Sequence, residues 1–252
     1  MSSSPVIRGD VIVLGAGAAG LAAAAQLFRL GLTVNLLEAR SRVGGRIHTV
    51  MHHSGLGGSS PVELGAELVH GKAPSLWQLC RRSKIRPREI HLPHLLFADG
   101  KWKSAEGAQK GQEILQGSDV DVSFEEALSR PEIGKKYSSA QRRFAEMFVE
   151  GFYVASSNQA GTSGLASMEN AEEKIEGDRS FRIAEGYHSV LNPSVKDVQR
   201  RGTLWLNAIA KGVRWRKYHV EVNAVTQTLS PLPCFVAKQL VVALPVAVLA
   251  GH

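Results

Sequence analysis

Residues 10–38 read DVIVLGAGAAGLAAAAQLFRLGLTVNLLE, and this stretch decides the fold class. The run at 10–14 is continuous and mostly β-branched, which predicts a strand buried on both faces. A glycine-rich turn follows, and the alanine-rich stretch 21–29 predicts a helix that ends at Gly31. A second apolar run at 33–37 predicts the next strand. The order strand, turn, helix, strand predicts an α/β fold.

The turn contains Gly15, Gly17 and Gly20 in the spacing GxGxxG, and each glycine has a physical reason. Gly15 allows the tight turn, Gly17 lets a pyrophosphate approach the backbone, and Gly20 lets helix and strand pack closely. The free N–H groups at the start of the helix attract phosphate. Glu38 follows the second strand, where a carboxylate can accept hydrogen bonds from ribose hydroxyls. An acid at this place favours FAD or NAD over NADP.

The run at 38–46, EARSRVGGR, extends this motif. It resembles FAD-dependent oxidoreductases of the flavin amine oxidase superfamily, which includes monoamine and polyamine oxidases, histone demethylases of that type, L-amino-acid oxidases and phytoene desaturases. The resemblance implies a Rossmann-like FAD-binding domain in which Arg40 and Arg46 contact the ribose-pyrophosphate region. A guanidinium offers paired donors to phosphate, which agrees with this role. Ala19 and Gly45 join the implied cofactor-binding residues.

Residues 63–71 read ELGAELVHG, and the two glycines indicate a close approach of the backbone to another group. The resemblance implies that this segment passes beside the isoalloxazine ring. The residues that would line the flavin are Gly65, Ala66, Glu67 and Leu68. Two interpretations of His70 stay open: a structural histidine, or a contact to the amine substrate as in polyamine-oxidase-like members.

Residues 72–185 differ in sequence pattern from the segments on either side, and they predict mainly helices. The expected elements are helices at 73–82, 123–129, 139–149 and 171–176 and a hairpin within 91–103. In the helix at 139–149, the residues Phe144, Met147 and Phe148 fall on one face and are expected in the core. The resemblance implies a mainly helical substrate-domain portion at 81–185, inserted between two parts of the FAD-binding domain at 1–80 and 186–252.

The last part of the chain predicts strands. Short strands with alternating faces are expected within 204–223, and one further strand at 235–244. In the family, a Leu-Asn-x-x-Val segment contacts the adenine through its backbone. Here 206–210 read LNAIA, so Ala210 stands at the valine position and some packing on the adenine is lost.

Composition and charge exclude several classes of protein. The chain has 252 residues, 44% hydrophobic and 21% charged, which excludes a disordered, collagen-like or disulfide-scaffold protein. Cys80 and Cys234 lie far apart, which signals neither a zinc cage nor a disulfide framework and favours a cytoplasmic location. His48, His52 and His53 have no further ligand set, so we expect no metal site.

The net charge of +7 permits anionic partners without choosing among them. The densest basic cluster, at 81–88, has few aromatic neighbours and is expected to be a solvated helix end, so no nucleic-acid partner is expected. The uncharged run at 11–28 is long enough for a membrane span or a signal peptide. Because Asp10 precedes it and glycines interrupt it, we expect no membrane segment.

The resemblance implies an FAD-dependent amine oxidase that oxidises an amine to an imine, with O₂ reoxidising the flavin to give H₂O₂. Family members continue beyond this chain with a lysine near the flavin, a second FAD motif and an aromatic pair. The chain is therefore expected to be truncated, or one half of a protein completed by a partner chain, and no catalytic residue is assigned. The alternatives are a catalytically incomplete FAD-binding module and a related flavoprotein of the L-amino-acid oxidase or desaturase type.

Overall fold

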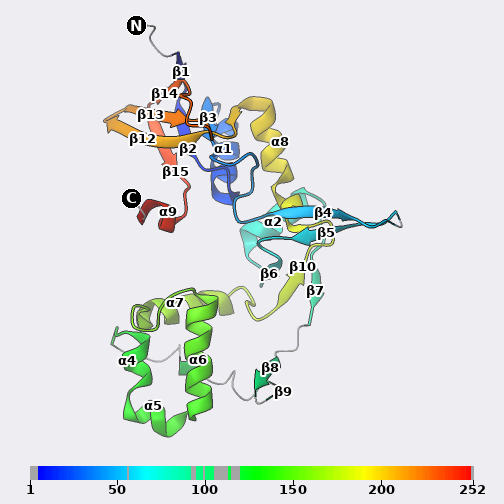
Figure 1. Ribbon diagram of the computed structural model, residues 1–252, viewed down its shortest axis with the longest axis vertical. Coiled ribbons are helices and arrows are strands. Elements are labelled where there is room, and N and C mark those ends of the chain that lie inside the picture. Colours follow the sequence, from blue (N-terminus) through cyan, green and yellow to red (C-terminus); the bar gives the residue numbers. More distant parts are fainter. Residues whose placement is uncertain are drawn as a thin grey trace. The chain divides into compact units, whose positions relative to one another are not determined.

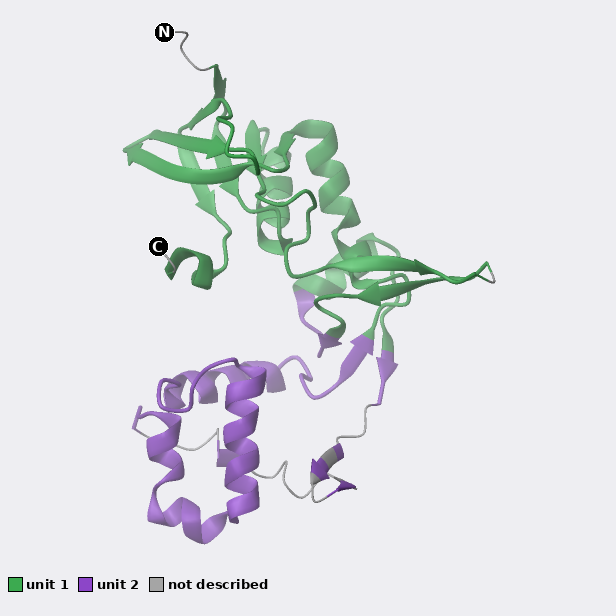
Figure 2. Cartoon of the chain, in the orientation of Figure 1, with its two compact units in different colours: residues 1–68, 75–88, 182–252 green, residues 69–74, 89–181 purple. Residues whose placement is uncertain are grey.

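The computed structural model describes residues 5–55, 57–91, 95–98, 100–104, 113–114 and 120–250. The chain divides into two compact units, drawn in green and purple in Figure 2. Unit 1 comprises residues 1–68, 75–88 and 182–252, and unit 2 comprises residues 69–74 and 89–181. The helical insertion was expected to begin at residue 81, whereas residues 75–88 lie in unit 1 and residues 69–74 in unit 2.

A parallel sheet of four strands in unit 1 has the order β11-β3-β2-β15. Its strands are β2 (Val11–Leu14), β3 (Val34–Leu37), β11 (Thr203–Trp205) and β15 (Gln239–Val242). Helix α1 (Ala18–Arg29) connects β2 to β3, so the predicted strand, turn, helix and strand are confirmed (Figure 1). Every residue of β2 and β3 is buried, as expected for a parallel sheet covered on both faces.

The packing around this sheet fixes the position of α1. Helix α8 (Asn192–Arg201) lies beside α1, and the ring of Phe28 fills the space at Gly202, where a Cβ would lie 1.9 Å from it. On β2, Ile12 and Leu14 share one face and pack in a hydrophobic cluster with Phe235. Among the described helices, none combines the length and the apolar character that crossing a membrane requires.

A second sheet of unit 1 has the order β1-β14-β13-β12. Its strands are β1 (Val6–Arg8), β12 (Ile209–Arg216), β13 (His219–Val225) and β14 (Cys234–Ala237). The prediction of one strand at 235–244 is wrong, because the chain leaves β14 at Lys238 and continues as β15 in the parallel sheet. The backbone N–H groups of Lys238 and Gln239 both donate to the carbonyl of Asp10, which holds the crossing in place.

The remaining elements of unit 1 and its borders are short. They are the hairpin β4 (Thr49–His53) and β5 (Ser59–Glu63), helix α2 (Pro74–Arg82), the 3₁₀ helix η2 (Tyr187–Leu191) and helix α9 (Val246–Ala250). A three-stranded sheet has the order β6-β10-β7, with β6 (Leu68–His70), β7 (Arg88–Ile90) and β10 (Ser180–Arg182). In the hairpin, β4 and β5 pair antiparallel, from Thr49 opposite Glu63 to His53 opposite Ser59.

Unit 2 is mainly helical, as the sequence predicts for this part of the chain. Its helices are α4 (Phe124–Leu128), α5 (Pro131–Lys136), α6 (Ser139–Phe152) and α7 (Thr162–Glu173). The hairpin predicted within 91–103 is formed by β8 (Leu95–Ala98) and β9 (Lys101–Ser104), although residues 92–94 and 99 lie outside the described residues. The Ser123 side chain accepts the N–H of Glu126 and caps α4.

Two predictions for these helices are wrong. On α6, Phe148 packs against the cluster around Phe124, as expected, and Phe144 is half-buried, but Met147 is 51% exposed. The fully buried residues of this helix are Ala145 and Val149, which join the same cluster. The side toward the core therefore carries smaller residues than the sequence pattern suggests. The helix expected at 171–176 is the end of α7, which begins at Thr162 and stops at Glu173.

Asp10 ties the start of β2 to the residue that precedes β3. Its Oδ2 accepts hydrogen bonds from the backbone N–H of Thr33 at 3.0 Å and from the Thr33 hydroxyl at 2.7 Å. Lys238 donates to Oδ1 at 3.2 Å. The hydrogen bonds from Thr33, together with Lys238, lower the pKa of Asp10 to about 2.

The depressed pKa of Asp10 gives a pH-dependent prediction. Since the pKa is lower in the folded than in the unfolded chain, this stabilisation is complete above the unfolded value and is lost as the pH falls through the folded value. We therefore expect Asp10→Asn to reduce the loss of stability between about pH 4 and pH 2. Urea denaturation followed by circular dichroism at each pH measures it. The same pH dependence in both proteins would contradict the prediction.

Candidate functional site

The glycine turn between β2 and α1 is closely packed against other backbone atoms at Gly15 and Gly20, and it has free space at Gly17. Gly15 has a φ of +95°, and its N–H donates to the carbonyl of Leu37. A Cβ at Gly20 would lie 1.8 Å from the Gly15 carbonyl oxygen, whereas a Cβ at Gly17 would meet nothing within 4 Å. Gly17 is the N-cap of α1 and offers no side-chain cap, and Ala19 in the first turn is exposed. The start of α1 thus has room for an anion.

Glu38 follows β3 directly and is buried, with 7% of its surface exposed. Its Oε2 accepts the N–H of Ala16 at 2.8 Å, and its Oε1 accepts the N–H of Arg40 at 2.9 Å. An ionised carboxylate has about four acceptor positions, so these two bonds leave capacity for further donors. Glu38 therefore connects the glycine turn to the arginine-containing loop.

The loop that contains the second pair of glycines packs on this turn. The N–H of Gly44 donates to the carbonyl of Ala16 at 2.8 Å. A Cβ at Gly45 would lie 3.3 Å from the Cα of Gly17. Gly44 and Gly45 have φ values of +101° and +60°, the left-handed region that favours glycine. The two glycine motifs, far apart in the sequence, are therefore in direct contact.

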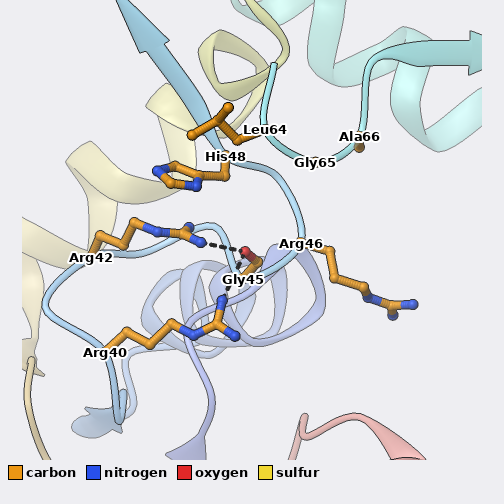
Figure 3. A pocket seen from close by; sticks show the side chains of 8 residues that line it. All are labelled: Arg40, Arg42, Gly45, Arg46, His48, Leu64, Gly65 and Ala66. Atoms are coloured by element: carbon orange, nitrogen blue, oxygen red, sulfur yellow. Dashed lines mark hydrogen bonds between the residues drawn. The ribbon is translucent and has the colours of Figure 1, made fainter. Parts of the chain in front are cut away.

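Arg42 holds the shape of this loop from within. Its guanidinium donates to the carbonyl oxygens of Val43 at 3.2 Å, Gly45 at 3.0 Å and Ile47 at 3.3 Å. Arg40 donates to the Gly45 carbonyl at 3.4 Å. Figure 3 shows both guanidinium groups turned toward Gly45, while the side chain of Arg46 points away from them. Arg40 and Arg42 are thus hydrogen-bonded to carbonyl oxygens of the loop, whereas the side chain of Arg46 is directed away from these bonds.

A cavity of about 560 Å³ lies beside this loop. Its lining residues are Arg40, Arg42, Gly45, Arg46, His48, Leu64, Gly65 and Ala66 (Figure 3). The segment after β5 forms one wall, because Ala66 donates to the Arg46 carbonyl at 3.0 Å and Leu64 to that of His48 at 2.7 Å. A Cβ at Gly65 would lie 2.0 Å from the Arg46 oxygen, so this approach requires glycine.

Glu63 anchors this wall, and its position two residues before Gly65 did not predict this role. Its carboxylate accepts the hydroxyl of Thr49 at 2.6 Å and the N–H of Tyr187 at 2.7 Å. Burial, followed by the nearby Cys80 and Glu63, raises the pKa of the Tyr187 phenol. Glu63 therefore fixes the end of the β4–β5 hairpin to η2.

Other predicted residues do not line the cavity. Ala210 lies in β12 at a β-bulge and packs against the core of the second sheet, although the preceding N–H groups of Asn207 and Ala208 donate to the carbonyls of Arg40 and Glu38. Leu68 is half-buried at the start of β6. Glu67 is exposed and forms an ion pair with Arg182.

His70 lies in unit 2. Its ring meets that of Phe152 edge to face, with the ring centres 5.8 Å apart, and Phe148 stacks on Phe152 at 4.9 Å. His70 is exposed. This arrangement leaves both interpretations of His70 open.

Three further residues of the cavity wall were not predicted as site residues: Arg42, His48 and Leu64. Arg42 stands within the motif that drew attention to its neighbours, but its contacts depend on the curvature of the loop. Across the described residues, no three His, Cys, Asp or Glu side chains gather in a way that could hold a metal ion. Cys80 and Cys234 are both free thiols.

Comparison with known proteins shows similarity to flavin-containing amine oxidoreductases, both in a family model and in individual relatives. Residues 18–117 match the family described as flavin containing amine oxidoreductase. Polyamine oxidase 3 of Oryza sativa subsp. japonica is 29% identical over 267 residues, which covers 96% of this chain and 53% of the relative. A flavin-dependent L-tryptophan oxidase of Lentzea aerocolonigenes is 58% identical over 93 residues, or 36% of this chain and 19% of the relative.

The solved structures agree in fold. A double mutant of putrescine oxidase superposes with a TM-score of 0.71 at 20% identity, covering 96% of this chain and 59% of that one. The chain thus spans about half the length of the polyamine oxidase that it matches from end to end. These matches confirm the predicted resemblance to the flavin-containing amine oxidase superfamily and the mixed α/β fold, and the family implies FAD as the cofactor.

Proposed function

We propose that unit 1 is a Rossmann-like FAD-binding domain and that the chain is part of an FAD-dependent oxidoreductase of the amine oxidase type. The observation that carries this proposal is the contact between the Gly17 turn and the Gly44–Gly45 loop, with Glu38 bonded to both segments. The turn leaves free space at an uncapped helix start, and a buried carboxylate stands beside it. Open space, N–H donors and arginines fit a dinucleotide with a diphosphate.

Each part of FAD would meet a distinct set of residues. The diphosphate would lie at Gly15, Gly17, Ala19 and Gly20, with charge supplied by Arg40 and Arg46, and with Gly45 allowing close approach. Glu38 would accept hydrogen bonds from the ribose, and Ala210 would meet the adenine side. The flavin would follow the segment Gly65, Ala66, Glu67 and Leu68. His70 would contact the substrate.

The protein's contribution is binding and orientation. When bound, FAD would supply the redox chemistry, with a hydride equivalent coming from the carbon beside an amine nitrogen, O₂ as the electron acceptor, and an imine and H₂O₂ as the products. The mainly helical unit 2 would form part of the substrate side. Arg42 and Glu63 would hold the two walls of the cavity in place through backbone carbonyls and N–H groups.

The test is an FAD titration of Gly17→Ala against the unchanged chain. Because a Cβ at Gly17 meets nothing within 4 Å, the variant should fold normally. The added methyl group would stand where the diphosphate approaches the backbone, so the Kd for FAD should rise about tenfold or more, equal to about 1.4 kcal/mol. Quenching of flavin fluorescence measures the Kd.

A matched control is Gly164→Ala, at another glycine with nothing within 4 Å. It lies in α7 of unit 2 and should bind FAD as the unchanged chain does. Equal FAD affinity in Gly17→Ala would contradict the proposed diphosphate site. Absence of FAD binding by the unchanged chain would contradict the proposal that unit 1 is an FAD-binding domain.

One alternative is a module that binds FAD without turnover. Another is a related flavoprotein acting on amino acids or apolar substrates. A peroxide assay with polyamines, aromatic amines and L-amino acids separates these functions in FAD-loaded protein. Peroxide from amines supports the amine oxidase, peroxide from amino acids supports the second alternative, and no peroxide with bound FAD supports the first.

A further inference from the structure

The hairpin of β12 and β13 has an exposed, basic and aromatic outer strand. Strand β12 is the last in the order β1-β14-β13-β12, so its outer edge pairs with no other strand among the described residues (Figure 1). All residues from 211 to 218 are exposed. The side chains include Trp215, 80% exposed, and Tyr218, 72% exposed, at the turn. None of these residues belongs to the proposed cofactor site.

The two faces of β12 carry different chemistry. Trp215 is paired with Val220 of β13, which is buried, so Trp215 stands on the face that is apolar in the neighbouring strand. Val213 shares this face and is 39% exposed. Arg214 and Arg216 stand on the opposite face. The edge therefore offers an apolar row on one side and a basic row on the other.

The charge of the hairpin is strongly one-sided. Residues 209–225 contain the cations Lys211, Arg214, Arg216 and Lys217 and the single carboxylate Glu221. Glu221 bonds to His219 at 2.9 Å, and its pKa is lowered by that hydrogen bond first and by the nearby arginines after it. The positive charge of the basic row thus exceeds what the hairpin itself neutralises, which calls for an anionic partner.

We propose that β12 is a docking edge for an acidic polypeptide segment in extended conformation, which adds a strand to the sheet. Such a segment, alternating acidic and apolar residues, would place carboxylates on Arg214 and Arg216 and apolar side chains on Val213 and Trp215. The backbone of the segment would form hydrogen bonds with the N–H and C=O groups at the outer edge of β12, and these bonds would provide affinity. The alternating side chains would provide specificity.

Other occupants fit the edge less well. A second copy paired through β12 would set cations against cations, which is destabilising in directly opposed positions. A lipid bilayer would leave the N–H and C=O groups of the edge without partners. Cations on an edge strand also discourage unwanted pairing, but this role does not explain an exposed tryptophan on the other face.

The test uses the full chain and a fluorescein-labelled octapeptide of alternating glutamate and valine, followed by fluorescence anisotropy. Arg214→Glu with Arg216→Glu should weaken binding about tenfold or more, since two attractive pairs become repulsive. The matched control is Arg81→Glu with Arg82→Glu, which changes the net charge equally at exposed positions of α2 and should leave binding unchanged. Trp215→Ser should also weaken binding.

Two measurements identify strand addition itself. The same peptide with alternate backbone nitrogens methylated should not bind, and the unmodified peptide should slow hydrogen exchange in the amides of β12. Equal binding of the methylated peptide, equal weakening by the control variant, or unchanged exchange in β12 would overturn the proposal. So would tighter binding of a thymidine octamer or of phosphatidylserine vesicles that is lost in Trp215→Ser.

Discussion

Gly20→Ala is expected to lower the free energy of unfolding by about 3 kcal/mol or more, the upper range for adding a methyl group where there is no space. The new Cβ would lie 1.8 Å from the carbonyl oxygen of Gly15 and 3.0 Å from its carbonyl carbon. These atoms belong to the backbone, so no side chain can move aside. The turn itself is held by the hydrogen bond from Gly15 to Leu37. Either α1 or the turn must shift.

Guanidinium denaturation followed by circular dichroism measures this loss, and Gly17→Ala in the same turn is the control. At Gly17 the added Cβ has free space, so the change in unfolding free energy should stay within about 1 kcal/mol, the range for a changed N-cap. The pair separates packing from cofactor binding. If Gly20→Ala and Gly17→Ala unfold at the same denaturant concentration, the close packing of α1 against the turn is wrong.

The three glycines of this turn show why this part of the fold could be predicted. The requirements at Gly15, Gly17 and Gly20 arise within a few residues of chain, so the spacing alone carries them. Glu38 is equally accessible to prediction, because it stands at the end of the next strand. The strands β2 and β3 and helix α1 follow from continuous apolar and alanine-rich runs, which the glycine turn and Gly31 divide into separate elements.

The parts that escaped prediction depend on contacts between distant segments. The change of sheet at Lys238 follows from hydrogen bonds to the carbonyl of Asp10, which is more than two hundred residues earlier in the chain. The buried face of α6 follows from what covers it, so Ala145 and Val149 are buried and Met147 is not. A single sequence contains the residues of such contacts but not their pairing.

The candidate site divides in the same way. Its arginines and glycines were named from the motif, whereas the role of Arg42 appears only when the loop bends so that three carbonyl oxygens converge on one guanidinium. The anchoring of the cavity wall by Glu63 likewise requires Thr49 and Tyr187 to meet at one carboxylate. The residues that give the site its chemistry can be recognised from short stretches of sequence, whereas the shape of the site depends on tertiary contacts.

Glu38→Ala is expected to weaken FAD binding by about 1–3 kcal/mol, the cost of leaving buried polar groups without partners. The carboxylate is 7% exposed and already accepts the N–H groups of Ala16 and Arg40. Its remaining acceptor positions are those proposed for the ribose hydroxyls. The variant loses both sets of bonds, so its unfolding free energy should fall as well.

Glu38→Gln separates these two effects, because its side chain has nearly the same size but one acceptor oxygen instead of two. It can keep one of the two backbone bonds, so its stability should lie between that of Glu38→Ala and the unchanged chain, and its FAD affinity should follow the same order. Flavin fluorescence titration gives the Kd, and denaturation without FAD gives the stability. A loss of stability with unchanged FAD affinity in Glu38→Ala would leave Glu38 as a structural link between the turn and the arginine loop, and the ribose assignment would be wrong.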